Sequence, residues 1–85
     1  MIELRDITNG PHGTVLVEVQ FNQFHLHVKI SDEAVFDFVR ATDGDAITAP
    51  QAVSQNRDRF GPVIEQVLIR HGVAIELITT EMLNR

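Results

Sequence analysis

Two runs of alternating apolar and polar residues constrain this chain more than any other feature. Successive side chains of a strand point to opposite faces, so the runs Thr14–Phe21 and Phe24–Ile30 each predict a strand with one buried face. Only Asn22-Gln23 separates the runs, which predicts an antiparallel hairpin with a two-residue turn. The pairs that this hairpin places face to face are Glu18 with His27, Gln20 with His25, and Leu16 with Lys29.

The segments after the hairpin carry helix signals. Ser31 is a favoured N-cap residue followed by two acidic residues, so we expect a helix from there to about Arg40. A second helix is expected to begin at the capping box of residues 48–51 and to end before Gly72. Gly61-Pro62 lies inside this helix and predicts a kink or a break there, because proline has no amide hydrogen to donate.

The two ends of the chain complete the predicted fold. Val73–Ile78 is apolar and β-branched enough to predict a third strand, and Ile2–Ile7 is a possible extra N-terminal strand. The chain therefore predicts a single α+β domain over residues 1–85 with the order β-β-α-α-β. In this fold two helices pack on one face of a small, mainly antiparallel sheet made of the hairpin and the C-terminal strand.

Composition narrows the function classes. The 85 residues carry a formal charge of −5 with scattered lysine and arginine, whereas phosphate binding needs clustered basic side chains, so we expect no direct nucleic-acid contact. The sequence lacks cysteine, and no run approaches the ~20 apolar residues that cross a bilayer. Motifs of serine hydrolases, zinc proteases and phosphate-binding loops are absent. We expect a cytoplasmic protein with no membrane contact, no enzymatic activity and no cofactor.

Three segments resemble a known protein family. Phe24–Val35 is similar to the strand-then-helix signature of a family of small bacterial proteins named domain of unknown function fourteen eighty-eight. Ala52–Arg57, followed by Ile64, resembles the helix of that family, and Ile78–Leu83 looks like its end strand. The resemblance implies a small α+β fold, and it implies no activity because the family has none assigned.

The predicted hairpin gathers polar side chains on its outer face. Glu18, His25 and His27 share that face, and cross-strand neighbours lie about 5 Å apart. Two imidazoles and a carboxylate at such spacing can bind Zn²⁺ or a related cation, which is one interpretation. The other is an exposed polar face with a modest Glu–His pair.

Arg57 is a second candidate. It shares a predicted helix face with apolar residues, so we expect its aliphatic stem to lie against the core and its charge to need a partner. One interpretation is a structural clamp to Asp43 and Asp45, with Asn56 assisting. The alternative is an anion site built on the same guanidinium.

Two apolar residues stand outside the main buried stripes. Leu16 lies among the outward residues of the hairpin, and Phe36 falls beside the main stripe of its helix. Together with the small size of the core, they predict a protein-interaction or self-association module, with a second copy or another cytoplasmic protein as partner. The alternative function is a small-molecule or metal-ion sensor that uses Glu18, His25 and His27.

Overall fold

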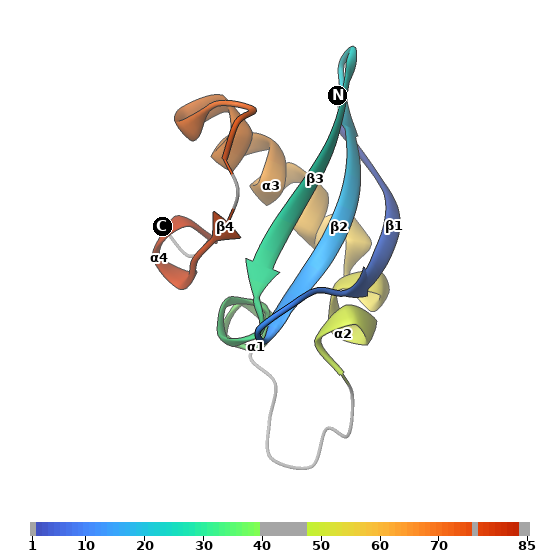
Figure 1. Ribbon diagram of the computed structural model, residues 1–85, viewed down its shortest axis with the longest axis vertical. Helices are drawn as coiled ribbons and strands as arrows, with labels where there is room; N and C mark the ends of the chain where they lie inside the picture. The colour runs from blue at the N-terminus through green and yellow to red at the C-terminus, as the bar shows by residue number, and fades with distance from the viewer. Residues whose placement is uncertain (1, 40–47, 76, 84–85) are drawn as a thin grey trace.

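The computed structural model describes residues 2–39, 48–75 and 77–83 of an α+β chain (Figure 1). It contains a four-stranded, mainly antiparallel sheet and helices. The elements in chain order are β1 (Ile2–Asn9), β2 (Thr14–Phe21), β3 (Phe24–Ser31), α1 (Asp32–Val39), α2 (Ala49–Gln55), α3 (Arg57–His71), β4 (Leu77–Ile78) and α4 (Thr80–Leu83).

The β2–β3 hairpin has the predicted register. Every predicted pair forms, including Glu18 opposite His27 and Leu16 opposite Lys29. Asn22 adopts φ 56°, a left-handed conformation that asparagine tolerates better than most residues other than glycine. The two-residue turn therefore forms without glycine.

The possible N-terminal strand is confirmed and is longer than the sequence indicates. β1 pairs antiparallel with β2 along its length, with a bulge between Leu4 and Asp6. The connection to β2 is closed by the Gly10 amide, which donates to the Thr14 carbonyl at 2.9 Å. Thr14 also donates its hydroxyl to the Pro11 carbonyl at 2.6 Å, so the turn is fixed from both sides.

The C-terminal strand differs from the prediction. Among the described residues of the predicted strand, only Leu77–Ile78 forms one, and it runs parallel to β3, pairing with Lys29 and Ile30. Gly72 ends the preceding helix at φ 88°, and Val73 and Ala74 form a turn. The chain therefore turns where the pattern predicts a strand. The observed order after the hairpin is β3-α1-α2-α3-β4-α4 rather than two helices and a strand.

The second helix is interrupted at Asn56 rather than at Gly61-Pro62. The Asn56 side chain donates to the Ala52 carbonyl at 2.9 Å, which ends α2. Its own carbonyl accepts the amides of Arg59 and Phe60, which starts α3. The helix continues through Pro62, and the hydrogen bond that proline omits would join it to the exposed Asp58.

The core lies between the inner face of the sheet and the helices. The apolar residues of β2 that alternate along the strand are fully buried, and α3 runs behind the strands in Figure 1. On the opposite face the side chains are exposed or partly exposed. Antiparallel sheets commonly cover one face and leave the other in water, so the outer face is available for contacts.

Candidate interaction surface

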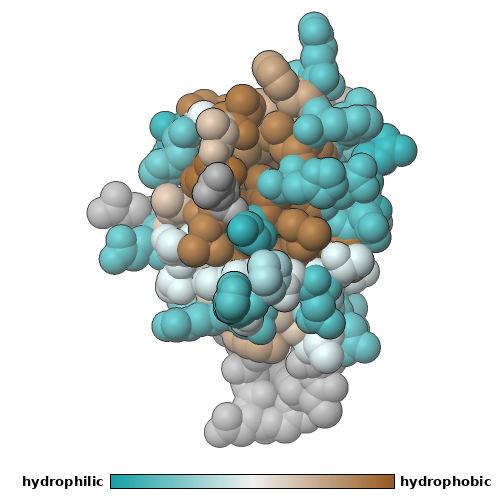
Figure 2. Space-filling view, in the orientation of Figure 1, coloured by the Kyte–Doolittle hydropathy of each residue, from teal (hydrophilic) through white to brown (hydrophobic). Residues whose placement is uncertain are grey.

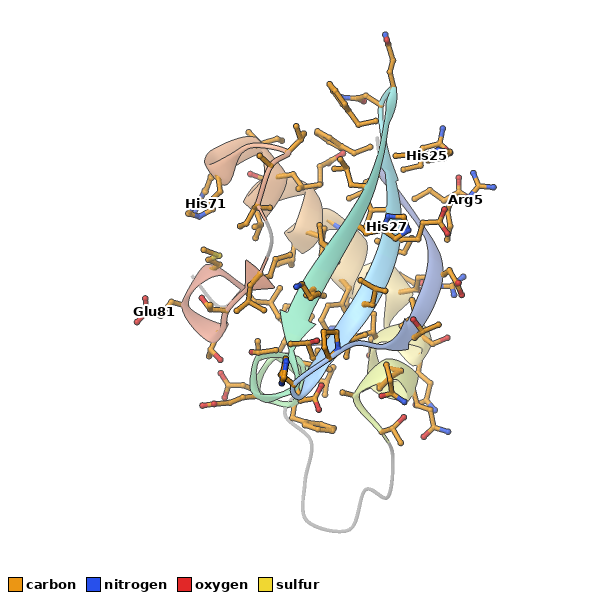
Figure 3. The ribbon with its side chains drawn as sticks, viewed as in Figure 1. Arg5, His25, His27, His71 and Glu81 are labelled. Atoms are coloured by element: carbon orange, nitrogen blue, oxygen red, sulfur yellow. The ribbon has the colours of Figure 1, made fainter. Side chains whose placement is uncertain are left out.

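The outer face of the hairpin carries His25 and His27 as predicted, but the side chains there do not come together as a metal site. His25 and His27 are both exposed on β3, and Figure 3 shows both imidazoles on the same side of the sheet as Arg5. Within residues 2–39, 48–75 and 77–83 no group of three His, Asp or Glu side chains lies close enough to hold a metal ion. The pairing explains this result, because Glu18 faces His27 directly while a diagonal neighbour lies about 7–8 Å away.

Other polar contacts occupy part of this face. Arg5 donates to the Gln20 side chain at 2.7 Å, and Gln20 is the residue that pairs with His25. Asp6 pairs with Glu18 from the other side, which sets two acidic residues opposite each other. The face is thus a mixed polar surface, in line with the second interpretation of the sequence pattern.

Arg57 does not lie against the core as the sequence pattern predicts. Its side chain is exposed at the start of α3, so its charge is not buried. Asp43 and Asp45, the predicted partners, lie outside the described residues. Asn56 has a different role from the predicted one, because its amide group ends α2.

Arg59, two positions after Arg57, contacts the end of α1. Its guanidinium lies 5.1 Å from the centre of the Phe38 ring and donates to the Phe38 carbonyl and to Asn56 Oδ1, each at 3.4 Å. The Phe38 ring in turn packs on Phe60, with 4.5 Å between ring centres. Arg59 therefore ties the end of α1 to α3. Sequence reasoning missed this role because Phe38 lies on a different helix.

The two predicted interaction residues have different surroundings. Phe36 is partly buried and packs against the core. Leu16 is also partly buried, but it lies on the outer face, opposite Lys29. Lys29 pairs on its other side with Leu77, so two apolar side chains flank one lysine across the sheet.

Exposed apolar side chains lie along the edge of β3 on both faces of the sheet, with Phe24 and Leu26 on the inner face and Leu77 beside Lys29 on the outer face. Phe24 is 50% exposed, Leu77 is 40% exposed, and Leu26 and Ile75 are partly exposed. We name these four residues the edge surface. Figure 2 shows an apolar area between β3 and α3. Large exposed apolar side chains at an open sheet edge are common at contact sites.

A shallow groove lies between α3 and α4. Its volume is about 230 Å³, with Val63, Val67 and Met82 among its apolar walls and Arg70 and His71 at its rim. His71 and the acidic Glu81 of α4 lie on the same side of the molecule in Figure 3. The groove thus combines the basic Arg70 with apolar walls.

Comparison with models of known protein families, with curated proteins and with solved structures finds no match to this chain. The resemblance to domain of unknown function fourteen eighty-eight therefore stays a prediction from the three segments that carry it. None of the helices in the described part of the chain is long and apolar enough to cross a membrane.

Proposed function

We propose that this protein is a non-enzymatic interaction module that binds a protein partner in the cytoplasm through the edge surface. The observation that carries the proposal is the exposure of Phe24 and Leu77 beside a strand that β4 covers at only two residues. A small domain that leaves large apolar side chains in water at an incomplete sheet edge stands to gain from a partner there.

The binding free energy that a partner could gain here can be calculated for Phe24. A phenylalanine side chain carries 150–250 Å² of surface, so covering the 50% of Phe24 that is exposed removes roughly 100 Å² from water. At about 25 cal/mol per Å², this burial contributes about 2.5 kcal/mol to binding. Losing it would weaken a complex on the order of 50-fold.

The test replaces Phe24 and Leu77 by aspartate, one at a time, and measures both self-association and partner capture. Sedimentation velocity of the purified protein across a wide concentration range reports a second copy as partner. Affinity capture from the source cells, read by mass spectrometry, reports a different partner. Ile69→Asp is the matched control, because Ile69 is 61% exposed but lies on α3 rather than on the sheet.

The proposal predicts that Phe24→Asp and Leu77→Asp weaken the complex while Ile69→Asp leaves it intact. Circular dichroism should give the same folded spectrum for all three variants, because the substituted side chains are exposed. Equal binding by all three variants, or a monomer that captures nothing, would refute the proposal.

A further inference from the structure

The free edge of β3 presents backbone groups without a strand partner. In a hairpin with a two-residue turn, the residues that flank the turn exchange backbone hydrogen bonds, and every second pair does the same. Phe21 pairs with Phe24 at the turn, so the amides and carbonyls of His25 and His27 point away from β2. β4 begins to pair only at Lys29, and among the described strands no other one lies on this side of β3.

We infer that this edge accepts an extended segment of a partner protein as an added strand, and that the segment alternates apolar and acidic residues. The inference deepens the proposed function and rests on it. The segment forms backbone hydrogen bonds with His25 and His27. Its alternate side chains lie on the two faces of the extended sheet.

The side chains of β3 define the chemistry of the segment. The inner face of the free stretch is apolar and its outer face is basic or neutral, with no acidic residue anywhere in Phe24–Ser31. The inner residues of this stretch are Phe24, Leu26 and Val28, and the outer ones are His25 and His27. Lys29 follows them on the outer face, at the point where β4 begins to pair. Lysine is positively charged, and a neutral imidazole can donate a hydrogen bond to a carboxylate. Acidic side chains on the outer face therefore complement β3, and basic ones oppose it.

The other edge of the sheet is less suited to an added strand. β1 is interrupted by the bulge between Leu4 and Asp6, and the bulge carries the charged Arg5. Bulges and charged side chains are the features by which natural sheets protect their edges from pairing with another chain. β3 has neither a bulge nor a proline, so the added strand is assigned to its edge.

A second copy of the hairpin does not fit this edge well. Two β3 strands paired antiparallel about Leu26 would place His25 of one copy against His27 of the other, which is the longest pairing available. In the same register, the turn Asn22-Gln23 of the second copy would lie opposite Lys29 and Ile30, where it would collide with β4. A register that avoids β4 shortens the pairing. A short extended segment avoids this collision, and it is the occupant that we assign.

Amide hydrogen exchange measured by NMR on the free protein is the first part of the test. The amides of Leu26 and Val28 point toward β2 and should exchange slowly, while those of His25 and His27 should exchange quickly. Slow exchange at His25 and His27 in dilute protein would overturn the inference, because the edge would already be covered. Protection that grows with protein concentration would assign the edge to a second copy and also overturn it.

The second part adds a blocked six-residue peptide of alternating valine and glutamate. Its binding should protect the His25 and His27 amides, and lysine in place of glutamate should weaken binding at least about tenfold. A peptide with N-methyl groups on alternate residues is the backbone control and should not bind. On the protein side, Lys29→Glu should reverse the preference between the glutamate and lysine peptides.

The experiments distinguish a failure of strand addition from a failure of the proposed interaction module. If Phe24→Asp abolishes partner binding but the glutamate peptide leaves the His25 and His27 amides unprotected, strand addition is wrong and the interaction module stands. If the peptide binds with no preference between glutamate and lysine, the assigned acidic chemistry is wrong. If the natural partner binds without protecting these two amides, the site of strand addition is wrong.

Discussion

Replacing Arg59 by alanine tests the contact between the end of α1 and the start of α3. The guanidinium is exposed, so its position 5.1 Å from the centre of the Phe38 ring contributes about 0.5–1 kcal/mol. The two hydrogen bonds are long, at 3.4 Å each, and add at most a few tenths of a kcal/mol. We therefore expect Arg59→Ala to lower the free energy of unfolding by about 1 kcal/mol. For a domain of this size the melting temperature falls by about 4–8 °C.

Urea unfolding followed by circular dichroism measures this change as a lower midpoint with an unchanged slope. Arg57→Ala is the matched control, because Arg57 is also exposed and lies only two positions away. A surface residue of this kind changes stability by no more than about 0.5 kcal/mol. Arg59→Lys should give an intermediate value, since lysine keeps the charge over the ring but loses the planar fork.

The reasoning would be refuted if Arg57→Ala destabilised the protein more than Arg59→Ala. That result would restore the clamp predicted from the sequence, in which Arg57 holds Asp43 and Asp45. An unchanged midpoint for Arg59→Ala would show that its contacts with Phe38 contribute nothing measurable.

Three further substitutions test the packing and the turns. Gly10→Ala places a Cβ 2.5 Å from Thr14 Oγ1 and 3.3 Å from the Leu16 amide nitrogen. We expect the free energy of unfolding, measured in urea, to fall by about 1–2 kcal/mol. Adding Thr14→Ala should recover part of this loss. Pro62→Ala restores a helical amide on an exposed position of α3, so the melting temperature should rise, and a fall would show that the proline ring makes a needed contact. Phe60→Ala empties a fully buried site and should cost about 3–5 kcal/mol, seen by circular dichroism as partial or complete unfolding at 37 °C.

The hairpin could be predicted in full because its two strands are adjacent in the sequence and its inner residues alternate without a break. A shift of one residue would turn Val17 and Val28 out of the core, where both are now buried. The starts of α1 and α2 were equally predictable, since the Ser31 side chain accepts the Ala34 amide at 3.1 Å and the capping box at Thr48 forms as expected. These signals are local, so the rest of the fold does not alter them.

The elements that could not be predicted depend on tertiary contacts. Pro62 has a stronger local tendency to break a helix than Asn56 has, yet α3 packs Phe60 and Ile64 into the core on both sides of the proline. That packing holds the helix together through Pro62. The role of Arg59 depends on Phe38, which lies on a different helix, so no spacing within one segment reveals it.

At the candidate site, too, the local sequence favours a structure that the whole fold does not adopt, and this difference bears on function. The side chains of Val73–Ile78 favour a six-residue strand, and such a strand would cover β3 as far as the hairpin turn. Because Gly72 and the turn after it direct the chain elsewhere, β4 pairs with β3 at only two residues. Backbone groups that face water lose little free energy, since water satisfies their hydrogen bonds. Stability alone therefore does not require the edge of β3 to be covered, and a partner strand can add hydrogen bonds there without breaking any that the sheet already makes. Because no described strand pairs with this edge of β3 before Lys29, we expect a partner to bind there rather than at the polar face that carries His25 and His27.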